Sequence, residues 1–308
     1  MTNENQPQEG LPELSGSAAP ARAAGGSVAS TIIRIVIYAF FCWFGMLLLA
    51  PLFYVAADTL ITFVAATFGA AAIANVICLR IYERRSFAEV GLGWSGASLR
   101  HLAYGLLGGA LVAALTVLIP LAMGLANWKE SAEKPSGWAT LAYFFVLLLF
   151  GVVAEELMFR GYGFQIMVRR FGAFATLLPM GVLFAAAHSG NMNVSYLGLV
   201  NTFLWGVALG WCVLRSGDLW LAIGVHAGWN WTLPLLGVNL SGFTMRVTGV
   251  ELQWKLDALW SGGDYGPEGG LLSLCALLLL LAGLYKAPVQ PQRLVLLEPG
   301  ALGERSES

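Results

Sequence analysis

Residues 138–160 read WATLAYFFVLLLFGVVAEELMFR, an apolar run that ends with two acids and one base. A helix needs about 20 apolar residues to cross the roughly 30 Å hydrocarbon core of a bilayer, and this run has that length. The whole chain follows the same pattern, because 57% of its 308 residues are hydrophobic and only 11% are charged. A soluble domain carries about 25% charged residues, so the composition indicates a polytopic membrane protein.

Seven more apolar blocks have a similar character, and charged, Gly-rich or Pro-containing stretches separate them. The eight predicted spans are Ile32–Tyr54, Leu60–Leu79, Leu102–Ala126, Trp138–Phe159, Ala173–His188, Val194–Leu214, Leu219–Leu236 and Leu271–Tyr285. The predicted fold class is therefore all-α, a polytopic membrane helix bundle of about eight transmembrane helices. The Gly-x-x-x-Gly spacings at Gly105–Gly109 and Gly206–Gly210 indicate close helix packing within this bundle rather than a dimer seam.

The chain divides into one membrane domain and two polar tails. Residues 1–30, rich in Pro, Gly, Ala, Ser and acids, are predicted to form a disordered N-terminal tail. Residues 31–286 form the transmembrane helical domain, in which the long outer segment Gly237–Gly270 is expected to cover the bundle. Residues 287–308, where Pro, Gln, Glu and Ser replace a run of leucines, are predicted to form a disordered C-terminal tail.

Lys and Arg segregate between alternate loops, which predicts the orientation of the protein in a cell membrane. With the N-terminus in the cytoplasm, twelve basic residues lie inside, and the outer segments hold only Lys129, Lys134, Arg246 and Lys255. Both termini are therefore predicted to be cytoplasmic. The net charge of −1, from 17 basic and 18 acidic residues, provides no large field for an anionic partner, so no nucleic-acid partner is expected.

Ionisable side chains gather in three of the predicted spans, although each costs about 2.5–3.5 kcal/mol near the bilayer centre. The fourth span contains Glu155 and Glu156 side by side, the fifth ends at His188, and the seventh contains His226. Two of the three histidines of the chain thus accompany its only intramembrane carboxylate pair. The third, His101, stands at the start of a span and is expected at the membrane interface.

Helical spacing predicts a different use for each of these groups. Residues four apart share a helix face, so Glu156 can pair with Arg160, whereas Glu155 points about 100° away and stays free of that partner. A carboxylate without a cationic partner can accept a proton from water as a general base. Residues His226 and Asn230 also share a face, and together they offer a donor pair for an oxyanion.

These groups can act together only at one depth in the bilayer. If the fourth helix ended at Phe159, Glu155 would lie at the cytoplasmic edge and His188 at the far end of its own span. A fourth helix that continues past Arg160 to the basic turn at Arg169 brings both groups to one level, at 1.5 Å per residue. We therefore expect a continuous fourth helix and a site in the cytoplasmic half of the bilayer.

The order of these residues resembles a known family, the CPBP intramembrane proteases. That family includes the type II CAAX prenyl endopeptidases and the bacteriocin-processing or self-immunity proteins, also called Abi. The resemblance covers about residues 86–231, and three complete motifs on separate spans carry it: Glu155-Glu156-x-x-x-Arg160, Phe184-x-x-x-His188 and His226-x-x-x-Asn230.

The resemblance implies a multi-pass intramembrane endopeptidase. Its catalytic residues would be Glu155, His188, His226 and Asn230, and its supporting residues would be Glu156, Arg160 and Phe184. The implied reaction is hydrolysis of a peptide bond near a lipid-modified or membrane-associated segment. In CAAX-box protein processing, this step removes the last three residues after a prenylated cysteine. The expected partners are a peptide or lipidated protein substrate and membrane lipid, and the sequence leaves the oligomeric state open.

Two questions stay open at this point. One is the metal: His188, His226 and Glu155 form a donor set for Zn²⁺ with an open water position, yet the family motifs also suit a metal-free glutamate mechanism, which we favour. The other is the class of function. A non-proteolytic membrane scaffold or bacteriocin immunity protein is the main alternative, and the complete motif set disfavours it. A proton-coupled transporter would show pseudo-symmetric halves and a broken helix, and the sequence indicates neither.

Overall fold

The computed structural model describes residues 27–55, 57, 59–245 and 247–298, and over this part of the chain the protein is an all-α membrane helix bundle, as predicted. Its helices are α1 (Val28–Tyr54), α2 (Thr59–Cys78), α3 (Gly96–Ala122), α4 (Trp138–Arg160), α5 (Tyr162–Phe171), α6 (Phe174–Ala187), α7 (Tyr196–Ser216), α8 (Trp220–Leu235), α9 (Ala258–Ser261) and α10 (Leu271–Lys286). The shorter turns are η1 (Leu79–Glu83), η2 (Phe87–Val90), η3 (Gly263–Tyr265), η4 (Pro267–Gly269) and η5 (Val295–Leu297).

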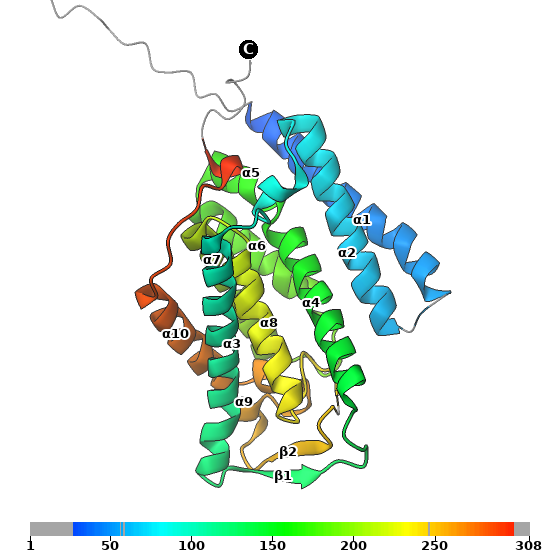
Figure 1. Ribbon diagram of the computed structural model, residues 1–308, viewed down its shortest axis with the longest axis vertical. Helices are drawn as coiled ribbons and strands as arrows, with labels where there is room; N and C mark the ends of the chain where they lie inside the picture. The colour runs from blue at the N-terminus through cyan, green and yellow to red at the C-terminus, as the bar shows by residue number, and fades with distance from the viewer. Residues whose placement is uncertain (1–26, 56, 58, 246, 299–308) are drawn as a thin grey trace, which may run out of the picture.

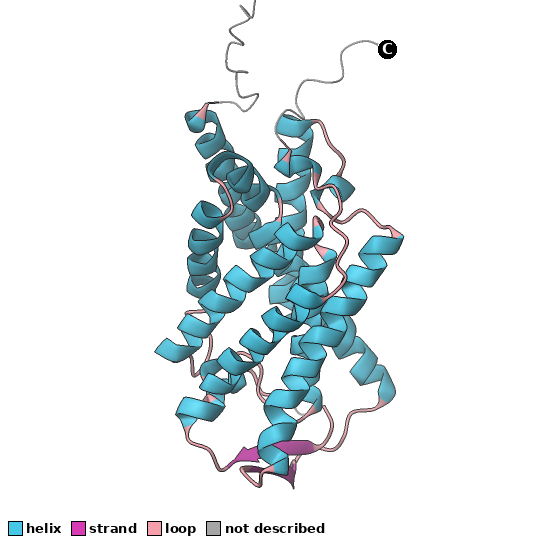
Figure 2. Ribbon diagram, turned by 90° about the vertical axis from the view of Figure 1, so that its left-hand side faces the viewer, coloured by secondary structure: helices cyan, strands magenta, loops and turns pink. Residues whose placement is uncertain are grey.

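A small sheet closes one end of the bundle. Strands β1 (Ala126–Glu130) and β2 (Val250–Trp254) pair antiparallel, with Ala126 opposite Trp254. Figure 2 shows this sheet at one end of the helices, and Figure 1 shows that the beginning of α1 and the turn η5 lie at the other end. The two ends of the described chain therefore lie on the same side of the bundle.

Each of the eight predicted spans coincides with a helix. Within the described part of the chain, five segments are long and apolar enough to cross a bilayer by length and composition: α1, α2 with η1, α3, α4 with α5, and α7. Helices α6, α8 and α10 are shorter, with 14, 16 and 16 residues. About 20 residues are needed to cross the hydrocarbon core, so these three helices are shorter than the core is thick.

Helices α3 and α8 cross closely because glycines line both sides of their contact (Figure 1). A Cβ added at Gly105 or Gly109 of α3 would collide with the backbone of α8, and one added at Gly224 or Gly228 of α8 would collide with the backbone of α3. The glycine Gly206 similarly lets α7 approach α6. The predicted Gly-x-x-x-Gly spacings thus serve packing within the bundle, where small residues allow close approach of two helices.

The prediction of a continuous fourth helix is wrong. Helix α4 ends at Arg160, the backbone of Gly161 departs from helical geometry (φ −71°, ψ −146°), and α5 begins at Tyr162. A helix break inside an apolar bundle requires partners for the backbone groups that it frees, because no water is available to bind them.

Two side chains from other helices supply these partners. The Asn75 side chain of α2 accepts a hydrogen bond from the Tyr162 N–H (2.8 Å) and donates one to the Leu157 carbonyl (3.1 Å). The Tyr38 hydroxyl of α1 donates to the Leu157 carbonyl (2.7 Å) and to the Met158 carbonyl (3.1 Å), which the break leaves without its helical donor. A Cβ at Gly161 would collide with the Asn75 amide, so the break needs glycine at this position.

The predicted disordered C-terminal tail is also wrong over residues 287–298. This segment packs against the bundle, where Leu294 and Leu296 are buried. The Gln292 side chain donates to Asp218 (2.8 Å) and to Ser98 (3.0 Å). Apolar side chains and these hydrogen bonds hold a segment whose polar composition suggested disorder. Residues 299–308 lie outside the described part of the chain.

Two smaller expectations also differ from the structure. The predicted N-terminal tail falls mostly on residues 1–26, outside the described part, but its last residues from Val28 onward belong to α1. The expected interfacial His101 is instead buried, and its Nδ1 lies 2.8 Å from the Asp218 carboxylate. That buried partner comes from the turn before α8, which explains how a polar ring is accommodated inside the bundle.

Candidate active site

Three helices bring the predicted catalytic groups together. Residues Glu155 and Glu156 lie in the last two turns of α4, His188 directly follows α6 as its C-cap, and His226 lies two turns into α8. The Glu155 Oε2 atom lies 3.8 Å from the Nε2 of His188 and 3.8 Å from the Nε2 of His226. The side chains of the three residues are 22%, 16% and 11% exposed, so the cluster is accessible although it is largely enclosed.

The other ring nitrogen of each histidine has its own partner. The Nδ1 of His188 lies 2.8 Å from the Phe184 carbonyl oxygen, which can only accept, so this nitrogen carries the proton. The Nδ1 of His226 lies 2.9 Å from the Glu156 carboxylate, which also accepts a hydrogen bond from an arginine. In both rings Nδ1 is engaged, so Nε2 is the ring atom that faces Glu155.

This geometry suits a water molecule between the three groups. A separation of 3.8 Å is too long for a direct hydrogen bond, but it leaves room for a water oxygen about 2.8 Å from both neighbours. The Glu155 Oε2 atom is buried and has no hydrogen-bond partner among the described residues. A buried carboxylate oxygen without a donor is rare in proteins, and a bound water would satisfy it.

The predicted pair between Glu156 and Arg160 is confirmed. Both side chains are buried, and Arg160 donates to the Glu156 Oε1 at 3.2 Å. The same Oε1 atom is the one that faces His226, so Glu156 connects α4 to α8. Through its other nitrogen, Arg160 donates to the carbonyl of Gly206 in α7 at 2.9 Å. The pair therefore ties three helices together behind the cluster.

The Phe184 ring fills the space beside these polar groups. The Arg160 guanidinium lies 4.5 Å from the centre of this ring, within the range of a cation–π interaction. The ring also packs on the imidazoles of His188 and His226, with centres 4.6 Å and 6.3 Å away. Its buried position explains why an aromatic residue stands one turn before His188.

The Asn230 side chain follows His226 by one turn on the same face of α8 and is partly buried. In the described part of the chain, no hydrogen bond engages its amide group. An amide that is free of other partners can donate to a developing oxyanion. Among the described residues no hydrogen bond joins this amide to the cluster, so the role of Asn230 stays a prediction.

The donor set does not fit a zinc ion as it lies. Among the described residues, no group of three or more His, Cys, Asp or Glu side chains is spaced to hold a metal ion. Ligand atoms around tetrahedral Zn²⁺ lie about 3.3–3.6 Å apart, given nitrogen and oxygen distances near 2.0–2.2 Å. The Glu155 oxygen lies 3.8 Å from each histidine nitrogen.

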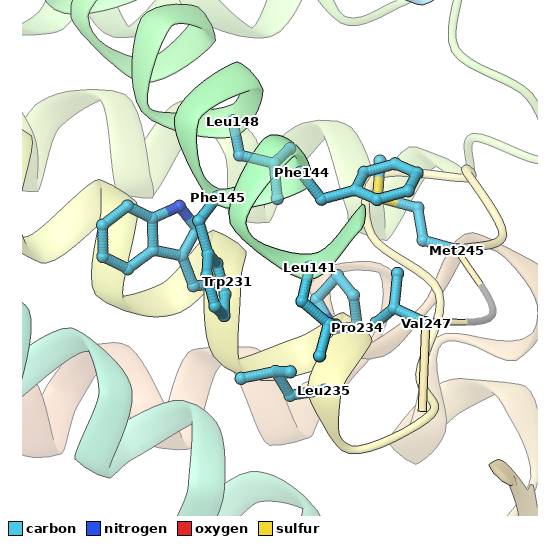
Figure 3. Close-up of a pocket in the computed structure, with 9 residues that line it drawn as sticks. All are labelled: Leu141, Phe144, Phe145, Leu148, Trp231, Pro234, Leu235, Met245 and Val247. Carbon is cyan, nitrogen blue, oxygen red and sulfur yellow. The ribbon is translucent and has the colours of Figure 1, made fainter. Parts of the chain in front are cut away.

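An apolar recess lies near the cluster, between α4 and α8 (Figure 3). Its volume is about 10 Å³, and its lining residues are Leu141, Phe144, Phe145, Leu148, Trp231, Pro234, Leu235, Met245 and Val247. Such a space holds about one water molecule and cannot enclose a hydrocarbon chain. A larger hollow of about 620 Å³ lies between strand β2 and the loops that carry Asn239 and Asp264, and it has polar walls. Neither hollow is lined by the predicted catalytic residues.

Three residues beside the site were missed by sequence reasoning. The Asn75 and Tyr38 side chains stabilise the helix break, and Glu268 holds the segment behind the site. Of these residues only Asn75 could have been recognised from the sequence, because it is the single asparagine in the apolar run of α2. The role of Glu268 depends on contacts between distant segments, and no local pattern indicates it.

Comparison with known proteins agrees with the motifs. No curated protein matches the chain. Residues 137–232 match a family model described as type II CAAX prenyl endopeptidase, Rce1-like. The matched segment runs from the start of α4 into the last turns of α8, so it contains every residue that the sequence analysis placed in the site. This match confirms the resemblance that the motifs predict, over the segment that carries them.

Proposed function

We propose that this protein is an intramembrane endopeptidase that hydrolyses a peptide bond near a lipid-modified or membrane-associated segment. The family match supports a CAAX-type intramembrane protease in general. The observation that carries the finer proposal is the convergence of Glu155, His188 and His226, with a buried carboxylate oxygen facing two imidazole nitrogens at 3.8 Å.

In the proposed mechanism, a water between these groups gives a proton to Glu155, and its oxygen attacks the scissile carbonyl carbon. The His188 ring orients this water, because its Nδ1 is fixed on a backbone carbonyl. The charge that develops on the carbonyl oxygen is stabilised by Asn230 and by His226, whose imidazolium form Glu156 supports. One such donor contributes about 2.7–4 kcal/mol. When the C–N bond breaks, the leaving nitrogen takes the proton from Glu155.

The apolar face of α4 beside the recess supports a lipid-linked substrate. The recess residues Phe144 and Leu148 lie eleven and seven residues before Glu155, so all three share one face of α4. In Figure 3 the side chains of Phe145 and Trp231, whose ring centres are 5.3 Å apart, lie together on one side of the recess. A substrate held in the bilayer by a prenyl or acyl chain would approach Glu155 along this apolar wall while its chain stays in the lipid.

We also propose that both termini are cytoplasmic and that the membrane is the cell membrane. The basic loops support this orientation through the positive-inside rule. The shared side of the two described chain ends agrees with it (Figure 1). The site would then lie in the half of the bilayer nearer the cytoplasm.

The helix break at Gly161 does not favour a transporter. Transporters use broken helices to present free backbone groups to ions or substrates. Here the Tyr162 N–H is already bound by Asn75, and the Met158 carbonyl is bound by Tyr38. The break therefore positions α5 and leaves no backbone site for a transported ion.

The proposal is tested with purified protein in nanodiscs and a quenched fluorescent peptide that ends in a farnesylated CAAX sequence. The Glu155→Gln variant should lose about 100-fold or more in kcat, since a general base contributes about 10²–10⁴. The control is Glu130→Gln, an exposed acid in β1, which should cleave like the wild type. The unfarnesylated peptide should be cleaved more slowly, and chelators should leave the rate unchanged. Equal cleavage by Glu155→Gln and wild type would refute the proposed role.

A further inference from the structure

A carboxylate outside the family motifs lies behind the site. The residue Glu268 belongs to η4, between α9 and α10. Its Oε2 accepts hydrogen bonds from the Ser241 backbone N–H and from the Ser241 hydroxyl (2.8 Å). Its Oε1 accepts one from the Trp229 indole N–H (3.1 Å), and its carbonyl oxygen accepts one from the Asn201 amide (2.9 Å). Both carboxylate oxygens are thus occupied by donors from two different segments.

One of these partners, Trp229, belongs to α8. The Trp229 side chain is buried, and this residue lies three positions after His226 and one before Asn230. Because its indole N–H is fixed by Glu268, the rotation of α8 about its axis is fixed at the turn that carries both groups.

The other partner, Ser241, is connected to His188 by hydrogen bonds through Asn191. The Ser241 carbonyl accepts a hydrogen bond from the Asn191 side chain (3.2 Å), and the Asn191 N–H donates to the His188 carbonyl (3.1 Å). The contacts therefore run from His188 through Asn191, Ser241 and Glu268 to Trp229.

The helices themselves do not supply this connection. Helix α6 packs mainly on α7, and α8 packs mainly on α3. The turn that contains His188 begins where α6 ends, so helix geometry alone does not fix its distance from α8. Both imidazoles nevertheless lie 3.8 Å from the same Glu155 oxygen. The Phe184 ring of α6 contacts both imidazoles, and the hydrogen bonds through Glu268 add a directional tie between the turn after α6 and α8.

We propose that Glu268 is a positioning residue of the peptidase. It fixes the positions of His188 and His226 relative to each other, because its hydrogen bonds tie the turn after α6 to α8. The inference rests on the proposed function. The carboxylate lies outside the matched residues 137–232 and its nearest contacts are Ser241 and Trp229, so it acts through these side chains and does not touch the substrate.

The first test compares Glu268→Gln with a matched control, Asp264→Asn. Both changes remove one charge from the same loop, but Asp264 is exposed and accepts a hydrogen bond only through its backbone carbonyl among the described residues. With the farnesylated peptide, kcat of Glu268→Gln should fall about 10- to 100-fold, because small misplacements of catalytic groups cost that much. The KM should change less than about twofold, and Asp264→Asn should match the wild type. A substrate-binding role would instead raise KM, which would overturn the inference.

The second test shows that the effect passes through α8. Trp229→Phe removes the indole N–H and keeps an aromatic ring, so it should also lower kcat. In the Glu268→Gln background, Trp229→Phe should have little further effect, because residues of one hydrogen-bond network are not additive. Glu268→Asp should restore part of kcat. Full additivity of the two changes would overturn the proposed route through Trp229.

Amide hydrogen exchange provides a readout that does not depend on cleavage. Exchange in residues 188–193 should rise in Glu268→Gln and stay at the wild-type level in Asp264→Asn. If the wild type cleaves no peptide, the proposed function fails, whereas the exchange result still decides whether the tie exists. If the wild type is active but Glu268→Gln keeps its kcat and exchange, the inference about Glu268 fails and the proposed function stands.

Discussion

Replacing Arg160 by methionine removes one charge of the buried pair beside the site and keeps a long, unbranched side chain. The Arg160 and Glu156 side chains are 1% and 0% exposed, and Arg160 also donates to the Gly206 carbonyl. Breaking a buried ion pair costs about 3–5 kcal/mol, because the remaining charge is left in an apolar surrounding. Since His226 remains as a second partner of Glu156, we expect Arg160→Met to lower the free energy of unfolding by about 3 kcal/mol, at the low end of this range.

The assay is SDS titration of the protein in dodecyl maltoside, followed by circular dichroism. The double variant Glu156→Gln with Arg160→Met should recover most of the lost stability, because no unpaired charge remains in the bundle. A matched control is Arg100→Met, since Arg100 is exposed and its substitution should change the free energy of unfolding by less than about 0.5 kcal/mol. A loss below about 1 kcal/mol for Arg160→Met, or a double variant no more stable than the single one, would refute the reasoning.

Two further predictions concern segments away from the cluster. Gly161→Ala should lower the free energy of unfolding by about 1–3 kcal/mol, because the new methyl group collides with the Asn75 amide. The control is Gly137→Ala, whose methyl group meets no atom within 4 Å and which should be nearly neutral in the same SDS titration. Burial acts to raise the pKa of Glu89, but hydrogen bonds from Ser86 and the nearby Arg85 outweigh it and hold this pKa below its usual value. Its contribution to stability is therefore present at neutral pH and is lost as the pH falls through the folded-state pKa. Corrected amide exchange in η2 should rise between pH 6 and pH 3 in the wild type, and Glu89→Gln should show no such rise.

The membrane helices could be predicted because the bilayer imposes a simple rule on the sequence. A span must be apolar over its whole length, so blocks such as residues 138–160 are recognised without any knowledge of their neighbours. The pairing of Glu156 with Arg160 was equally accessible, because it depends only on a spacing of four within one helix. The meeting of Glu155 with His188 and His226 was predicted from depth, although the assumed continuous fourth helix was wrong.

The features that sequence reasoning missed all depend on partners from elsewhere in the chain. A single glycine at 161 does not end a helix by itself; Asn75 and Tyr38 make the break stable by binding its backbone groups. The polar composition of residues 287–298 suggested disorder, but Leu294 and Leu296 find a buried surface on the bundle. The tie through Glu268 joins segments that no local pattern relates.

The short helices α6 and α8 have a consequence for the supply of water to the reaction. At 1.5 Å per residue, their 14 and 16 residues span only about 21 Å and 24 Å, against a hydrocarbon core of roughly 30 Å. Helix α8 is buried in the bundle, but α6 exposes Phe174, Leu178 and Val182, and a bilayer thins around a short apolar segment of this kind. Hydrolysis consumes a water molecule at each turnover, and local thinning shortens the apolar barrier which that molecule crosses to reach Glu155. The same helices that carry the histidines thereby bring the aqueous phase closer to the peptide bond.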